Sequence, residues 1–200
     1  MLLNGFPGVG KLTIAKSLRD RLQKINVPHR LMDNHLLIDP VVAIEPTRDE
    51  SHYSLRREFR QAAIEGLKRV KDEGLIVIFT ACLAVSSVPV PYDDIDQLKQ
   101  YVDLADGRGV PLIFVSLLFD LENNKDRLCS EEKKEGGKTK LSDAGVLEQI
   151  SGSTSILDRE LVLGCGKGGK IYHLELDTTE RSVDQTTQSV LEYVRRCRKR

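Results

Sequence analysis

The segment GFPGVGKLT, residues 5–13, follows a short apolar stretch and leads into a segment with helical periodicity. Gly5, Gly10 and Lys11 match the spacing G-x-x-x-x-G-K of a phosphate-binding loop, which needs a strand before it and a helix after it. Glycines let the backbone approach an anion, and the N–H groups from Gly8 to Thr13 can point inward at the helix N-terminus. The segment therefore predicts a polyphosphate site, and the alternative is a glycine turn that only caps a helix.

Outward from this loop, apolar runs alternate with amphipathic segments. The continuous apolar runs Leu75–Ala81 and Pro111–Phe119 are typical of strands buried on both faces. Strands that alternate with helices predict an α/β fold, a parallel sheet covered on both faces by helices. The other expected strands are Met1–Asn4, His29–Met32 and Lys170–Leu176, and the expected helices are Lys11–Lys24, 51–73, Asp93–Asp106, Leu121–Glu132 and Val183–Arg198.

Composition narrows the class of protein. The 200 residues suit one domain, and 30 Lys and Arg balance 30 Asp and Glu, which argues against a nucleic-acid partner bound through bulk charge. Four widely spaced cysteines indicate reduced thiols, and no metal-binding spacing is present. Without a long apolar run or a secretory signal, we expect no membrane partner and a cytoplasmic location. The basic tail, residues 195–200, leaves a nuclear location open.

The loop has a particular form. Leu12 follows the lysine, where a hydroxyl residue is usual, and Thr13 comes next. This G-x-P-G-x-G-K-x-T pattern resembles the loop of nucleoside-monophosphate kinases of the adenylate kinase type. The resemblance implies ATP and Mg²⁺ as cofactors, with Thr13 near the metal, directly or through water. It implies nucleotide contacts at Gly5, Pro7, Gly8, Val9, Gly10, Lys11, Leu12 and Thr13.

Asp33 ends the second expected strand, His29–Met32. Ligands of doubly wound sheets lie at the carboxyl ends of strands, so this carboxylate is expected close to the phosphate loop. The layout resembles P-loop small-molecule kinases such as shikimate kinase, gluconate kinase and chloramphenicol phosphotransferase. In them an Asp just after the second strand binds or activates the acceptor. We therefore expect Asp33 to bind the acceptor hydroxyl or accept its proton, and the alternative is a turn or cap role.

Three arginines follow on the helix expected at 51–73. Arg56, Arg57 and Arg60 are spaced so that two of them can share a helix face and bind substrate. A guanidinium group suits a carboxylate or a phosphate on an acceptor. The alternative is a solvated basic face.

The resemblance also implies roles for later segments. Arg127 stands at the entry to a polar, lysine-rich segment and is expected to contact the nucleotide and assist catalysis with Lys11 and Asp33. The segment itself, about residues 130–142, is expected to act as a small lid, although it lacks a second arginine. Asp177, after the last strand, is expected to lie near the adenine. Ser182 is the stronger candidate for the cap of the final helix.

Together these observations predict a P-loop NTPase fold in one domain, residues 1–200. It has a doubly wound, five-stranded parallel sheet of order 2-3-1-4-5 and an acceptor region at about residues 34–60. The expected function is transfer of phosphate from ATP to a small hydroxylated molecule. A nucleoside-monophosphate kinase is an alternative, although the strand ending at Ala81 lacks the acidic pattern expected next. A nucleotide-binding or NTP-hydrolysing module without an acceptor is another. The acceptor's identity and the oligomeric state are left open.

Overall fold

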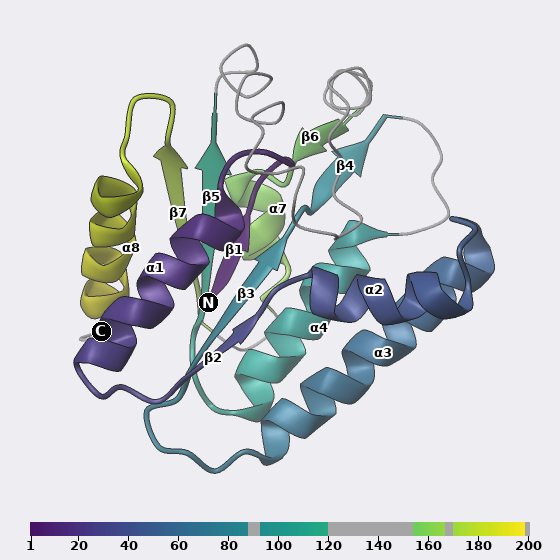
Figure 1. Cartoon of the computed structure of the whole chain (residues 1–200), viewed down its shortest axis with the longest axis horizontal. Helices are drawn as coiled ribbons and strands as arrows, with labels where there is room; N and C mark the ends of the chain where they lie inside the picture. The colour runs from purple at the N-terminus through teal and green to yellow at the C-terminus, as the bar shows by residue number, and fades with distance from the viewer. Residues whose placement is uncertain (88–92, 120–153, 167–169, 199–200) are drawn as a thin grey trace.

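Five parallel strands form the central sheet, in the order β2-β3-β1-β5-β7 (Figure 1). A computed structural model describes residues 1–87, 93–119, 154–166 and 170–198. The strands of this sheet are β1 (Leu2–Asn4), β2 (His29–Met32), β3 (Ile76–Ala81), β5 (Leu112–Leu118) and β7 (Ile171–Asp177). Counted along the chain, this order is 2-3-1-4-5, so the expected fold class and strand order are confirmed.

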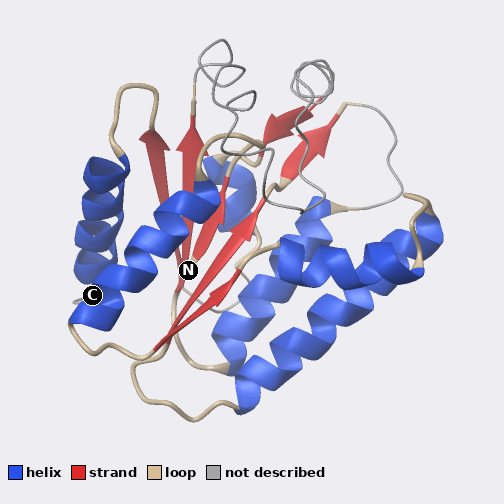
Figure 2. Ribbon diagram, in the orientation of Figure 1, coloured by secondary structure: helices blue, strands red, loops and turns tan. Residues whose placement is uncertain are grey.

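Helices cover both faces of the sheet (Figure 2). The helices are α1 (Lys11–Lys24), α2 (His35–Ile44), α3 (Glu50–Arg69), α4 (Asp94–Gly107), α7 (Arg159–Gly164) and α8 (Val183–Arg198). Consecutive residues of β1 belong to opposite faces: Leu2 packs with α3, α4 and α7, whereas Leu3 packs with α1 and α8. Because successive side chains of a strand point to opposite faces, a continuous apolar run can supply both cores.

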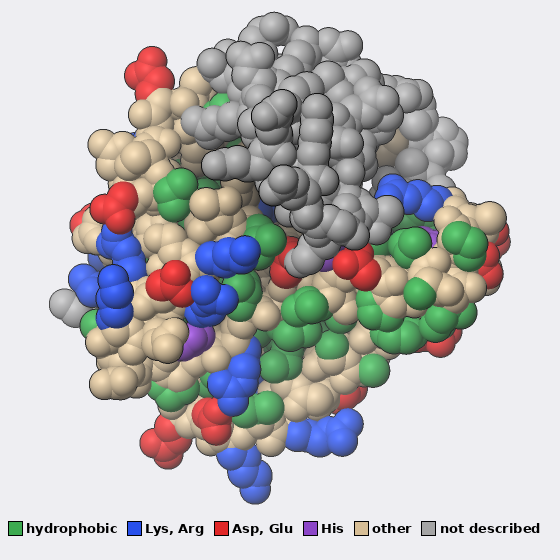
Figure 3. Space-filling view, in the orientation of Figure 1, with side chains coloured by type: hydrophobic (Ala, Val, Ile, Leu, Met, Phe, Trp, Pro, Cys, Tyr) green, Lys and Arg blue, Asp and Glu red, His purple; other side chains and the backbone are tan. Residues whose placement is uncertain are grey.

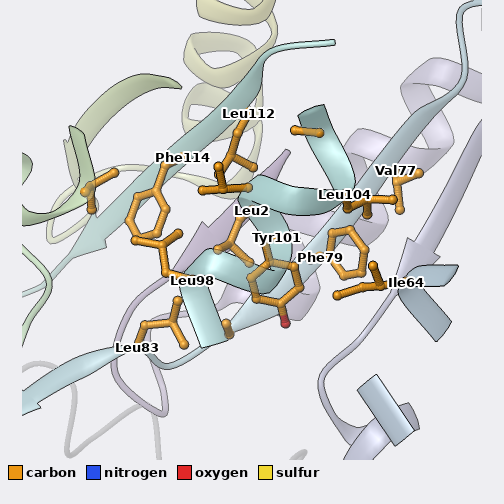
Figure 4. Packing of buried hydrophobic residues seen from close by; sticks show 14 of the residues in the cluster. Leu2, Ile64, Val77, Phe79, Leu83, Leu98, Tyr101, Leu104, Leu112 and Phe114 are labelled. Carbon is orange, nitrogen blue, oxygen red and sulfur yellow. The ribbon is translucent and has the colours of Figure 1, made fainter. Parts of the chain in front are cut away.

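The core beneath α3 and α4 is the more aromatic of the two (Figure 4). Tyr101 of α4 and Phe79 of β3 lie with their ring centroids 4.9 Å apart, and Ile64 of α3 belongs to the same cluster. This packing fixes α3 and α4 against β3. Helix α3, which carries Arg56, Arg57 and Arg60, is therefore packed against the sheet through this core.

Several details differ from the sequence-based expectation. The helix expected at 51–73 begins at Glu50 and ends at Arg69, because Val70 has an extended backbone (φ −68°, ψ 122°). Helices α2 and α7 were not expected. A second sheet of two short antiparallel strands, β4 (Ala84–Ser86) and β6 (Thr154–Ile156), was not expected either.

Three expectations lie outside the described residues. The helix expected at Leu121–Glu132, Arg127 and the lysine-rich segment at about 130–142 all fall in the range 120–153. Within the described residues, none of the helices combines the length and the apolar character that a membrane span requires.

Candidate active site

The loop between β1 and α1 crosses the carboxyl edge of the sheet, the upper edge in Figure 1. Gly10 stands at the N-cap of α1 in the left-handed region, with φ 87°. Gly5 is needed for space, because a Cβ there would lie 2.7 Å from the Leu117 carbonyl oxygen and 2.9 Å from Cγ1 of Val9. The backbone can therefore adopt the tight loop expected of the glycine motif.

Lys11 lies across this loop. Its Nζ donates to the carbonyl oxygens of Gly5, at 2.7 Å, and Phe6, at 2.8 Å. The first turn of α1 contains no acidic residue, so the positive end of the helix dipole is not neutralised locally. The ammonium group and the helix N-terminus thus place positive charge at the same loop, which suits a polyphosphate anion.

A cavity of about 350 Å³ adjoins the loop on the side of α1 and α8. One wall comes from the loop and α1, and the other comes from the β7–α8 connection. The volume lies within the range of small-molecule sites. The lining residues are Gly8, Val9, Gly10, Thr13, Ile14, Thr178, Arg181, Ser182, Val183 and Thr186.

The β7–α8 connection is held in a defined conformation. Thr178 uses both its backbone N–H and its hydroxyl to donate to the Leu118 carbonyl oxygen. Ser182 and Gln185 exchange reciprocal side-chain-to-backbone hydrogen bonds of 3.1 and 2.9 Å, so the expected cap of α8 is a capping box. Asp177 does not line the cavity. Its exposed carboxylate accepts from Thr179, whose hydroxyl and N–H lower the pKa of Asp177.

Asp33 lies at the carboxyl end of β2 and is buried, with 7% of its surface exposed. Its Oδ1 accepts a hydrogen bond of 2.8 Å from the hydroxyl of Thr80 on β3. The same hydroxyl oxygen accepts from the N–H of Asn34, at 3.0 Å. Asp33 and Asn34 thus form a turn that is attached to the strand next to β1. The acidic group that was expected near the loop is therefore positioned by the sheet.

The three arginines of α3 have three different environments. Arg56 is largely buried and reaches the turn after β2, where its Nη2 lies 3.4 Å from Oδ1 of Asn34. Arg60 is buried and donates to Gln100 of α4 at 2.8 Å, and burial lowers its pKa to about 10. Arg57 is exposed. The structure thus brings Arg56 to the turn that carries Asp33, orients Arg60 toward α4, and leaves Arg57 on the outer surface.

The guanidinium of Arg56 is a buried charge without a full partner. Burial lowers its pKa, and its Nε is buried without a hydrogen-bond partner. Within the described ranges, no carboxylate forms an ion pair with it. A buried cation is costly unless an anion pairs with it. Arg56 is therefore suited to bind an anionic group of a ligand.

Asp94 is a residue of this region that the sequence analysis missed. It begins α4, accepts a hydrogen bond of 2.9 Å from the Ala84 N–H, and interacts electrostatically with Arg56 and Arg60. Burial raises its pKa to about 6, although the Ala84 N–H and the two arginines act in the opposite direction. An acid in the first turn of a helix looks like an ordinary helix-start residue, so the sequence offered no distinguishing signal.

The segment after β3, which contains Cys82 and Leu83, lies near both Lys11 and Asp94. The side-chain amide of Asn4 accepts from the Leu83 N–H at 2.6 Å and donates to the Leu83 carbonyl at 2.9 Å, which fixes this segment beside the phosphate loop. Burial raises the pKa of the Cys82 thiol, while the nearby Lys11 lowers it. Lys11, Cys82, Asp94 and Arg56 therefore belong to one electrostatically connected region at the carboxyl edge of the sheet.

Solved structures with this arrangement of elements include proteins named as kinases of small molecules and nucleotides. The APS kinase CysC of Mycobacterium tuberculosis, in complex with AMPPNP and APS, superposes with a TM-score of 0.57 and 16% identity over 97% of this chain and 95% of that chain. Thymidylate kinase from Candida albicans gives a TM-score of 0.57 and 14% identity over 97% and 89%. This protein has the fold of the P-loop kinases.

The same fold is found outside proteins that are named as kinases. The tunicamycin resistance protein of Deinococcus radiodurans has a TM-score of 0.55 and 16% identity, over 97% of this chain and 94% of that chain. No family model and no curated protein matches the sequence. At these identities the likeness establishes the P-loop kinase fold, and the reaction has to be argued from the chemistry of the site.

The donor atoms at the loop of this P-loop kinase fold are compatible with Mg²⁺. Magnesium prefers oxygen ligands and usually keeps several waters while it binds nucleotide phosphates through one or two protein groups. Thr13 supplies one exposed hydroxyl at the cavity. Among the described residues, no cluster of three or more His, Cys, Asp or Glu side chains could hold a metal ion. A metal at this position would therefore depend mainly on phosphate oxygens.

Proposed function

We propose that this protein transfers the γ-phosphoryl group of ATP to a hydroxyl of a small acceptor that also carries an anionic group. The observation that carries the proposal is Arg56, a largely buried guanidinium without an ion-pair partner among the described residues, at the turn that contains Asp33. An anionic group on the acceptor would pair with Arg56. The reacting hydroxyl would then lie near Asp33, between this turn and the phosphate loop.

The roles of the chain's own groups follow from their chemistry. The N–H groups of the loop and the ammonium of Lys11 would hold the phosphates and balance charge during transfer. Asp33 would accept the proton of the acceptor hydroxyl. The acceptor oxygen would form a bond to the γ-phosphorus of ATP, while the bond from this phosphorus to the oxygen that bridges it to the β-phosphate breaks and ADP leaves. Mg²⁺ near Thr13 would neutralise phosphate charge when bound.

The base of the nucleotide would occupy the cavity between α1 and the β7–α8 connection. The support is its size, about 350 Å³, and its continuity with the loop at Gly8 and Gly10. We propose Thr178 and Ser182, which line this cavity, as contacts for the nucleoside. Asp177 is the weaker candidate, because its carboxylate is exposed and already bound by Thr179.

Nucleotide binding is tested by calorimetry on Lys11→Ala, with Lys16→Ala as the matched control. Lys16 is an exposed lysine of α1, five residues beyond Lys11. We expect Lys11→Ala to lower the affinity for ATP at least about tenfold, because it removes a charge that faces the phosphates, and Lys16→Ala to bind like the unmodified protein. Equal affinities in all three proteins would contradict the nucleotide site.

Phosphoryl transfer is tested by coupled detection of ADP with pairs of acceptors. Each pair consists of a hydroxylated carboxylate, sulfate or phosphate and its uncharged ester or amide. We expect turnover with an anionic member, a loss of about 100-fold or more in kcat for Asp33→Asn, and a higher KM for the acceptor in Arg56→Gln. Arg57→Gln is the matched control on the exposed side of the same helix. ATP hydrolysis that no acceptor stimulates, as the sole activity, would contradict the proposal.

A further inference from the structure

Thr80 lies on β3 at the point where the pairing of β2 with β3 ends. The β2–β3 ladder ends at the pair Met32–Phe79, so Thr80 is the first residue of β3 beyond the last paired residue of β2. The side chain is buried, with 2% exposed. Its hydroxyl meets the chain of β2 where the backbone ladder stops, and it contacts both residues of the turn, Asp33 and Asn34.

The two hydrogen bonds of this hydroxyl determine each other's direction. The Asn34 N–H can only donate, so the Thr80 oxygen accepts there, at 3.0 Å. The single hydroxyl proton is then directed to Oδ1 of Asp33, at 2.8 Å. Oδ1 is therefore held as an acceptor. A backbone group fixes the hydroxyl, and the hydroxyl fixes the plane of the carboxylate.

We infer that Thr80 is a positioning residue for phosphoryl transfer, which holds the Asp33 carboxylate oriented toward the acceptor hydroxyl. This inference rests on the proposed function. A rigidly held base reacts without first losing rotational freedom. Because Thr80 lies on a strand packed on both sides, it supports the turn more firmly than a loop residue could.

The competing explanation is purely structural, namely that Thr80 only ties the turn to β3. Three variants separate the two explanations. Thr80→Val keeps the shape and removes the hydroxyl, and Thr80→Ser restores the hydroxyl without the methyl group. Thr187→Val is the matched control, because Thr187 is also fully buried and its hydroxyl donates to a backbone carbonyl, that of Val183 at 2.7 Å in α8.

The experiment measures kcat and KM with the acceptor identified by the ADP assay. For Thr80→Val we expect kcat to fall roughly ten- to a hundredfold, with little change in the KM for ATP. Thr80→Ser should regain most of the rate, and Thr187→Val should lose stability while the folded enzyme keeps its rate.

A double-variant cycle completes the test. If Thr80 acts through Asp33, adding Thr80→Val to Asp33→Asn should leave the residual rate nearly unchanged, because the group that Thr80 positions has already gone. A normal kcat in Thr80→Val, alongside an inactive Asp33→Asn, would overturn the role of Thr80 alone. Full activity of Asp33→Asn, or no acceptor-dependent turnover in the unmodified protein, would overturn the proposed function and this inference with it.

Discussion

Gly5 and Gly66 are two glycines with opposite surroundings, and they predict opposite effects of alanine. A Cβ on Gly5 would meet the Leu117 carbonyl oxygen at 2.7 Å, whereas Gly66, exposed within α3, has nothing within 4 Å. We expect Gly5→Ala to lower the free energy of unfolding by about 2 kcal/mol through overpacking. Gly66→Ala should raise it by ~0.5–1 kcal/mol through helix propensity. Urea unfolding measures both changes, and equal stabilities would contradict the account.

The sequence also predicted those site residues that directly follow an expected strand. It did not predict site residues that are defined by contacts with distant segments of the chain. Asp33 was found because it follows an expected strand, and its burial at the turn agrees with that position. Asp94 was missed because its partners, Ala84 and Arg56, lie on β4 and α3. Arg60 was separable from Arg57 in principle, since it shares helical spacing with the buried Ile64 and Leu67.

At the scale of elements, the start of α8 depends on the capping box of Ser182 and Gln185. We expect Ser182→Ala to lower the free energy of unfolding by about 1 kcal/mol, because the N–H of Gln185 loses its acceptor. Ser54→Ala is the control, since Ser54 is exposed in the second turn of α3 and does not cap the helix. The measurement is thermal or urea unfolding, and an equal stability of the two variants would show that the box does not hold α8.

The elements that were predicted well are those with strong periodicity or clear ends. The bounds of α1, β2 and α8 agree with the sequence-based ranges. Helix α2 escaped prediction because Pro40 lies inside it, and proline normally disfavours a helix interior. Strands β4 and β6 have three residues each and pair across about 70 residues of sequence, so neither gives a periodic signal. The elements that were missed are therefore either very short or contain a residue that normally disfavours their secondary structure.

For the molecule as a whole, the balanced charge hides a local imbalance. On the face drawn in Figure 3, positive and negative side chains are interspersed, as a net charge of zero suggests. Within the described part of the site, by contrast, the three cations Lys11, Arg56 and Arg60 lie in the same region as two largely buried acids, Asp33 and Asp94. Such a region attracts a small anion without making the whole surface basic, which fits a nucleotide and an anionic acceptor better than a long polyanion.

The carboxyl group of Asp94 makes the free energy of unfolding depend on pH. The pKa of Asp94 is raised by burial from 3.8 to about 6, so the folded state holds its proton more tightly than the unfolded state does. The stability that this group contributes is complete below about pH 4 and is lost as the pH rises through 6. Buried His173, whose pKa is lowered by burial, acts in the opposite direction, since its contribution is lost as the pH falls.

Because the two groups oppose each other, the test compares Asp94→Asn with the unmodified protein at each pH. Asparagine can still accept from the Ala84 N–H but carries no charge. We expect the variant to equal the unmodified protein near pH 4 and to be more stable by ~2 kcal/mol above pH 6.5. Asp96→Asn, which removes an exposed partner of Lys99 in the same helix turn, should stay within about 0.5 kcal/mol throughout. A difference for Asp94→Asn that is the same at pH 4 and pH 7 would mean that the carboxyl is not buried in the folded protein.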